Sequence, residues 1–222
     1  MRRIAKTLIA GTALLTLTAS PLFADDWEDE WEDEDSGEAE IINGQLNFGP
    51  VWSQINVSID GIEGDVSGAA SAVGNAVNIV TLSNTVVEND QANFGDVGAE
   101  VNAEILDIGG DVILTATAVC NAASISTDPD STSVTSNQSC GADDPSATIN
   151  ADISNVAGGV GLAAIAVGNQ IEVDSNANSF PINSFQENIS GSFASVNANI
   201  SGAGAVDLSA TAVGNSATFV HY

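Results

Sequence analysis

Apolar and polar residues alternate strictly in four short segments of this chain. Each segment is five residues long, and its first, third and fifth residues are apolar. The segments are residues 55–59, 101–105, 149–153 and 196–200. Side chains two residues apart point to the same face of a β-strand, so this pattern predicts strands with one buried face.

A second pattern, Ala-x-Ala-Val followed by Gly-Asn, occurs four times, with Cys in place of Gly in the second copy. Its asparagines are 46, 48 and 46 residues apart. They are Asn75, Asn121, Asn169 and Asn215. So regular a period indicates that one structural unit is stacked on copies of itself.

A third landmark opens with glutamine and has the form Gln-x-Asn in its clearest copies. It begins at Gln45, Gln91, Gln138 and Gln186, and it interleaves with the alanine-rich landmark. Each repeat therefore divides into two half-units of about 23 residues, a length that suits one rung of a β-solenoid. We predict an all-β chain: a β-solenoid of about eight rungs, built from four repeats with two rungs each.

Stacked Asn and Gln side chains would form hydrogen-bond ladders between such rungs. A β-sandwich is the alternative, because alternating strands separated by turns also describe that fold. The regular spacing of the landmarks favours the solenoid.

The first 40 residues differ from the rest. Residues 1–24 have the features of a secretory signal peptide, with a basic start, a short apolar segment and Ala24 at the expected cleavage point. Eleven of the 16 residues in 25–40 are acidic, which predicts a disordered tail. Residues 41–222 form the predicted repeat domain. After removal of the signal we expect no membrane-spanning segment.

The charge of the chain limits its partners. The formal charge is −27, and it becomes −30 when the three basic residues of the predicted signal (Arg2, Arg3 and Lys6) are removed. The remaining chain has no Lys or Arg. Nucleic acid is disfavoured as a partner by charge repulsion. The partners that we expect are copies of this chain, other surface-fibre proteins or a polysaccharide.

Two cysteines are present, Cys120 and Cys140. Cys120 replaces the Gly of the second alanine-rich landmark, and Cys140 replaces the Asn of the third glutamine landmark. In the rung alignment they lie on neighbouring rungs, two positions out of register, on the same strand face. Export to an oxidising compartment favours a disulfide, and we predict a structural disulfide between them.

Few residues suit catalysis. His221 is the only histidine, and no Gly-x-Ser-x-Gly nucleophile motif is present. We predict that the chain is not an enzyme and holds no cofactor. Calcium is the one inorganic candidate, at the acidic residues Asp128, Asp130, Asp143 and Asp144. The sequence favours reading these four as solvated turn residues.

The repeats resemble those of two kinds of bacterial surface protein. The Gln-x-Asn-Φ-Gly pattern and the segment 214–217 (Gly-Asn-Ser-Ala) are similar to the curli subunit repeat. The Ala-Thr-Ala-Val-Gly-Asn unit is similar to those of holdfast anchor proteins in stalked alphaproteobacteria. The resemblance covers residues 45–222. It implies a secreted protein of the bacterial outer surface, which anchors cells or forms extracellular fibres.

The leading hypothesis is therefore a structural or adhesive cell-surface protein that assembles through open β edges. It would serve in surface attachment, as in holdfast anchoring, or as a curli-like fibre subunit within a biofilm. The alternative is a monomeric extracellular module that binds a carbohydrate or calcium through its loops.

Overall fold

The computed structural model describes residues 39–82, 84–128, 132–141, 145–176 and 179–222. The predicted signal peptide and most of the predicted acidic tail lie outside these residues. The predicted boundary at residue 41 was two residues late, because strand β1 begins at Ala39. Ala39 and Glu40 already pair with Thr85 and Val86, so they belong to the sheet.

The described residues form ten strands and no helix, and therefore no helix that could cross a bilayer. Four strands make one sheet: β1 (Ala39–Asn47), β4 (Thr85–Asn93), β7 (Thr132–Cys140) and β9 (Ile182–Asn188). The second sheet contains β2 (Val51–Ile62), β3 (Val66–Thr81), β5 (Val97–Ile108), β6 (Val112–Thr127), β8 (Ser146–Ser175) and β10 (Phe193–His221).

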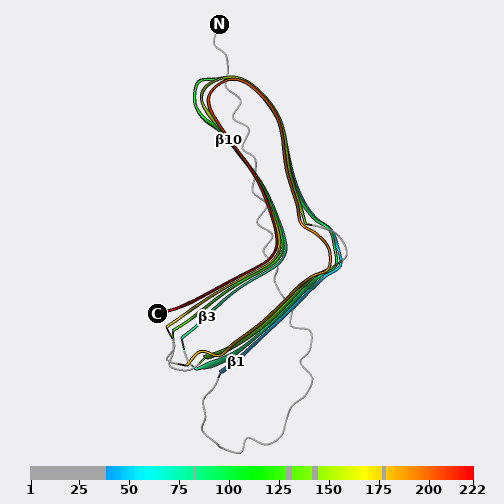
Figure 1. Cartoon of the computed structure of the whole chain (residues 1–222), viewed down its shortest axis with the longest axis vertical. Helices are drawn as coiled ribbons and strands as arrows, with labels where there is room; N and C mark the ends of the chain where they lie inside the picture. Colours follow the sequence, from blue (N-terminus) through cyan, green and yellow to red (C-terminus); the bar gives the residue numbers. More distant parts are fainter. Residues whose placement is uncertain (1–38, 83, 129–131, 142–144, 177–178) are drawn as a thin grey trace, which may run out of the picture. The chain divides into compact units, whose positions relative to one another are not determined.

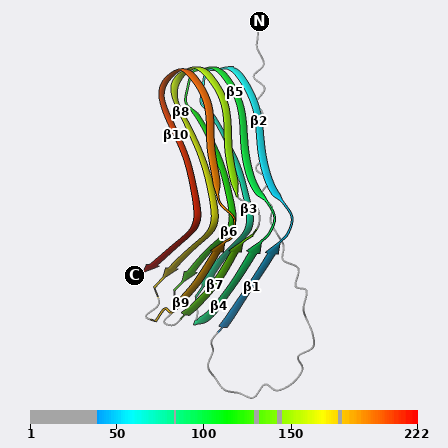
Figure 2. The same cartoon turned by 45° about the vertical axis from the view of Figure 1, so that its right-hand side comes forward.

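All strand pairs are parallel, and each strand pairs with its equivalent in the next repeat. Gln45 pairs with Gln91, Gln91 with Gln138, and Gln138 with Gln186. Figures 1 and 2 show the result, a stack of coils in which equivalent segments lie directly side by side. The predicted β-solenoid is confirmed, and the sandwich alternative is not adopted.

The prediction of eight rungs was wrong, because each whole repeat makes a single coil. Paired residues are 46 to 48 positions apart, so the stack has four coils. The half-units of about 23 residues do not stack on each other. One is the outgoing arm of a coil and the other is the returning arm, and the two arms face each other across the interior (Figure 1).

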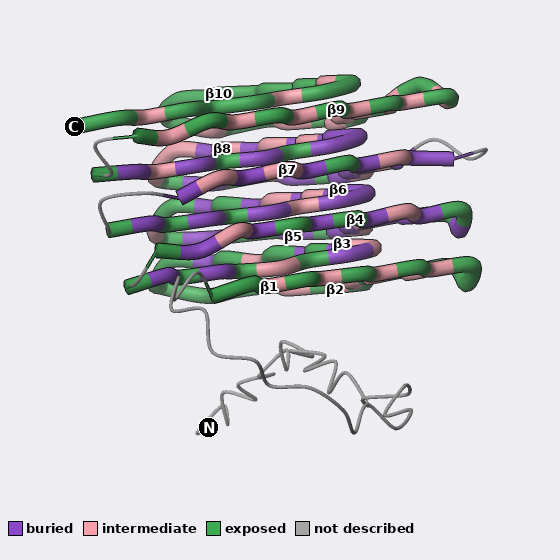
Figure 3. Tube along the Cα trace, turned by 90° about the horizontal axis from the view of Figure 1, so that it is seen from below, coloured by how far each residue is buried: buried purple, intermediate pink, exposed green. Residues whose placement is uncertain are grey.

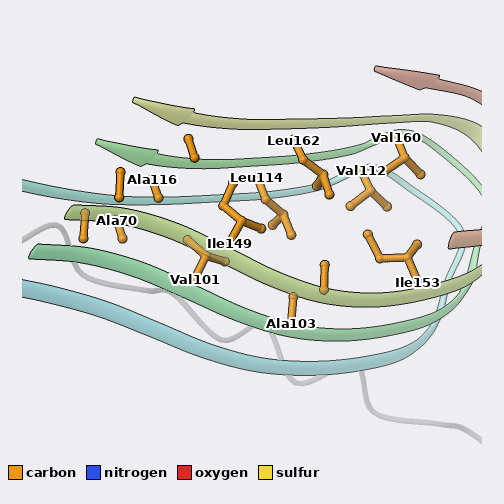
Figure 4. Close-up of a cluster of buried hydrophobic side chains, with 14 of the residues drawn as sticks. Ala70, Val101, Ala103, Val112, Leu114, Ala116, Ile149, Ile153, Val160 and Leu162 are labelled. Carbon is orange, nitrogen blue, oxygen red and sulfur yellow. The ribbon is translucent and has the colours of Figure 1, made fainter. Parts of the chain in front are cut away.

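Both arms bend at the same level, which we call the elbow (Figure 1). The outgoing arm bends between β1 and β2, and the returning arm bends within β3, where Gly74 is skipped in the pairing while the register stays the same. The elbow separates two apolar clusters. The larger contains Val101, Leu114, Ile149 and Leu162 and is drawn in Figure 4; the smaller contains residues such as Val87 and Ile125.

The alternating segments behave as the sequence predicts. Val101, Ile105, Ile149 and Ile153 are buried, whereas the Asn, Glu and Asp residues between them lie on the outer face. Alanine occupies the facing positions of the returning arm, among them Ala116 and Ala164. Small side chains on one arm let the two arms approach closely, so the core is thin.

At the far end of each coil the chain reverses through a residue in the left-handed region. Gly61, Asp107, Asn155 and Gly202 have φ values of 71°, 57°, 55° and 67°. They stand at the same place in successive coils, where glycine or a short polar side chain tolerates this backbone conformation. Asn155 donates a hydrogen bond to Oδ1 of Asp107 over 2.9 Å, so the non-glycine pair is also bonded between coils.

Burial depends on the position of a coil in the stack. Inward-facing side chains of the second and third coils, and most of those of β3 in the first, are buried, whereas those of β1, β2 and the fourth coil are partly or fully exposed (Figure 3). Leu162 in the third coil is buried, but its equivalent Leu208 in the fourth coil is 48% exposed. Within the described residues, β1 and β2 at one end of the stack and the fourth coil at the other therefore leave core-type side chains partly exposed.

Candidate functional site: the amide-lined elbow and the two open ends

The two sequence landmarks are the two sides of the elbow. In the alanine-rich landmark, Ala70 and Ala72 point into the core and Gly74 lies at the bend. Beyond the bend, Asn75 is the first side chain of β3 that points into the interior. In the glutamine landmark, Asn47 accepts a hydrogen bond from the backbone N–H of Gly49, which turns the outgoing arm. The landmarks recur because every coil must bend here.

The glutamines form a continuous ladder inside the elbow. Gln91 donates to Gln45, Gln138 to Gln91, and Gln186 to Gln138, over 2.7 to 2.8 Å. Each also donates to a backbone carbonyl on the returning arm of its own coil, as Gln45 does to Ala76 over 2.8 Å. These side chains therefore join neighbouring coils and also join the two arms of one coil.

The asparagines of the alanine-rich landmark form a second ladder that runs in the opposite sense. Asn75 donates to Asn121, Asn121 to Asn169, and Asn169 to Asn215, over 2.7 to 2.8 Å. Each of the first three also donates to a carbonyl on the outgoing arm of the next coil. These acceptors are the carbonyls of Ala92, Ser139 and Glu187.

The predicted disulfide is present between Cys120 and Cys140, with Cα atoms 5.9 Å apart. The cysteines do not lie on one strand face, as the rung alignment suggested. They face each other across the elbow, from β6 of the second coil and β7 of the third. In the other coils the same two positions hold a glycine and an asparagine, and a Cβ at Gly74 would collide with the amide of Asn93. The cysteine pair replaces this glycine–asparagine contact.

The calcium candidates are not brought together by the described structure. Asp128 is exposed at the end of β6 and accepts a hydrogen bond from Asn176 over 3.2 Å. Asp130, Asp143 and Asp144 lie outside the described residues. Among the described residues, no group of three or more His, Cys, Asp or Glu side chains could hold a metal ion.

Sequence reasoning missed a third ladder, on the outer face of the sheet. Asn102 donates to Asn56, Asn150 to Asn102, and Asn197 to Asn150, over 2.9 to 3.1 Å. These asparagines line a shallow groove of about 820 Å³ across all four coils, together with Glu104 and Asp152. The sequence feature that could have predicted this ladder is the asparagine at the second position of every alternating segment.

The elbow ladders should contribute strongly to stability. Asn121 is completely buried and makes hydrogen bonds with Asn75, Asn169 and Ser139. Replacing it with alanine leaves buried partners unpaired, so we expect Asn121→Ala to lower the free energy of unfolding by about 2 kcal/mol in urea titrations. Asn215→Ala, the equivalent change in the exposed end coil, should cost less than about 1 kcal/mol. Equal losses in both variants would contradict the role of the buried ladder.

The cysteine pair allows a matched test. Opening a disulfide that closes about 20 residues should cost about 3 kcal/mol in the chain-entropy model. We expect Cys120→Ser with Cys140→Ser to lose that amount, measured by urea unfolding. Cys120→Gly with Cys140→Asn restores the contact used in the other coils and should lose less. The explanation fails if the glycine–asparagine variant is no more stable than the double serine variant.

The comparisons with known proteins give one match, to a family model. No curated protein and no solved structure matches the chain. The family model of holdfast attachment protein D matches residues 53–221, a range that runs from β2 to the end of β10. Attachment is an adhesive role at the bacterial cell surface and not an enzymatic one. Because the match covers well over half of the sequence, this chain belongs to the holdfast attachment protein D family.

Proposed function

We propose that this chain is exported and helps to attach a bacterial cell to a surface by joining other proteins through the open strand edges at the two ends of its stack. Such a joint would serve either surface anchoring or a curli-like fibre. The observation that carries the proposal is the exposure of the two end coils. Core-facing side chains of β1, β2, β9 and β10 are only partly covered by described residues, and each end coil is paired on one side only.

The strands at the two ends offer unpaired backbone groups. β1, β2 and β3 pair with β4, β5 and β6, and β9 and β10 pair with β7 and β8. Their other edges have no strand beside them among the described residues. Such edges bind added strands unless charge, proline or a covering element blocks them. Here Gln45, Asn75 and Asn215 extend the hydrogen-bonding surface of the backbone.

Charge would control this association. The chain beyond the predicted signal has no Lys or Arg, so copies repel one another at long range, and salt screens that repulsion. The acidic tail that precedes β1 in the sequence adds like charge to every copy. We infer that the tail slows premature assembly during export.

A second candidate function rests on the outer groove. Its four asparagines offer amide groups in a row that crosses the coils, and Glu104 and Asp152 flank them. A linear carbohydrate could lie along this row and bond through its hydroxyl groups. In this alternative the protein stays monomeric and binds the polymer, or calcium, at its surface. Size-exclusion chromatography with and without calcium separates the two candidates, because only the first predicts larger assemblies.

Leu208 provides the test of the proposed end contact. Its side chain is half exposed in the fourth coil and would be covered by an added coil. Covering an uncharged leucine is favourable, whereas covering a carboxylate is costly. We expect Leu208→Glu to weaken association at least tenfold in sedimentation experiments, and to reduce surface attachment of cells that carry only this variant.

Ile113→Glu is the matched control. Ile113 is 56% exposed, but it lies on the outer face of β6, away from both ends of the stack. The control should associate like the unaltered protein, although it carries the same added charge. Equal weakening by both substitutions, or no association of the unaltered protein at any concentration, would refute the end contact.

A further inference from the structure

We propose that the partner at each open end is a second copy of this chain, stacked head to tail so that the first coil of one copy continues from the fourth coil of the next. The inference rests on the open-end association proposed above and specifies its partner, polarity and register. It derives from the direction of the three amide ladders, which leaves complementary groups at the two ends.

The glutamine ladder ends in a donor at one end and an acceptor at the other. Gln91 uses both N–H groups of its amide, one to Gln45 and one to the carbonyl of Ala122. Gln45 donates only to Ala76, so one of its N–H groups has no partner within the described residues. At the other end, Oε1 of Gln186 lacks the donor that the equivalent oxygens of Gln91 and Gln138 receive. In a head-to-tail stack, Gln45 of one copy would donate to Gln186 of the other.

The outer ladder ends in the same way. Asn56 accepts from Asn102, but its own N–H groups have no partner in the described part of the chain. Asn197 donates to Asn150, and its oxygen accepts from no described residue. In the same head-to-tail stack Asn56 would donate to Asn197. Two identical ends placed together would instead set donor against donor or acceptor against acceptor.

The inner asparagine ladder has the opposite direction and is also complementary. Its free acceptor is Oδ1 of Asn75, and its free N–H belongs to Asn215. Asn215 also departs from the other ladder members in its backbone partner. Asn75, Asn121 and Asn169 each reach the outgoing arm of the following coil, whereas Asn215 has no following coil and makes a longer bond of 3.3 Å to Gln186. With a second copy in place, its acceptor would be the carbonyl of Leu46, which is equivalent to that of Ala92.

Charge and shape are compatible with this register. Asp60 would lie beside Ser201, Asp65 beside Ala205, and Glu187 beside Leu46. None of these carboxylates meets another carboxylate at the joint. Apolar residues meet as well: Phe48 of the first coil, which stacks on Phe94 of the second, would lie beside Ile189 of the other copy. A second copy therefore supplies the matching groups along the whole coil.

The native disulfide gives the geometry for a direct test. Cys120 lies on the returning arm of one coil and Cys140 on the outgoing arm of the next, with Cα atoms 5.9 Å apart. The equivalent positions across the proposed joint are Gly214 of one copy and Asn47 of the other. We expect Gly214→Cys and Asn47→Cys, mixed in equal amounts with oxidised glutathione, to form a covalent heterodimer on non-reducing gels.

The cross-linking experiment has a control mixture and three outcomes that would contradict the proposal. A tag of different mass on each variant distinguishes heterodimers from homodimers, and Ile113→Cys replaces Gly214→Cys in the control mixture. Homodimers from either variant alone, in yields equal to the mixture, would show a joint between like ends and overturn the polarity. Association of the unaltered protein without cross-linked heterodimer would overturn the register. Absence of all association would instead refute the open-end contact itself.

A second pair of substitutions tests polarity without cross-linking. Asn56→Asp keeps the oxygen that accepts from Asn102 but removes the N–H groups needed at the joint, whereas Asn197→Asp keeps the oxygen needed there. Both add one negative charge. We expect the first substitution to weaken association at least fivefold more than the second, measured by sedimentation. Equal weakening, or the reverse order, would overturn the polarity.

Discussion

Hydrogen bonding in register between successive coils is the interaction on which the rest of this structure depends. Each strand of the second and third coils has an equivalent strand on both sides, and the side-chain amides of the elbow repeat the same connection. The sequence leaves little else to hold the coils together. Beyond the predicted signal peptide it has no Lys or Arg for ion pairs, and its core is thin and rich in alanine and valine. Stability in such a stack is close to a sum over coil-to-coil interfaces.

The elbow explains why buried amides occur in a protein with so small a core. An uninterrupted pair of facing arms could be closed with aliphatic side chains alone, as in the cluster around Leu114 and Ile149. Where both arms bend, the backbone carbonyls of Ala76 and Ala92 turn toward the interior and need donors. Gln45 and Asn75 supply these donors and also meet their equivalents in the next coil. The disulfide occupies the same elbow and replaces one glycine–asparagine contact with a covalent link.

Much of this arrangement could be predicted from the sequence, because stacking imposes a repeat on the chain. The alternation in residues 101–105, the spacing of the landmark asparagines and the pairing of the two cysteines all follow from it. The number of coils could not be predicted. Alternation shows which face of a strand is buried but not what covers it, and two half-units bury the same face whether they stack or oppose each other. The pairing of residues 46 to 48 positions apart distinguishes the cases, and the bond from Gln45 to Ala76 across the interior agrees with it. The left-handed backbone of Asp107 and Asn155 could not be predicted either, because neither residue is the glycine that usually marks this conformation.

An adhesive role suits a molecule of this kind, because the stack of coils ends in two surfaces that no described strand covers. The most direct measurement of the central claim is native-state hydrogen exchange, resolved along the chain. If the ladders are in register, amides of β5, β6 and β8, which lie inside the sheet, should exchange only through global unfolding. Amides of β1 and β10 should exchange faster, through fraying of the end coils. Equal protection in all four coils of the monomer, or slow exchange confined to β1 and β10, would contradict the account.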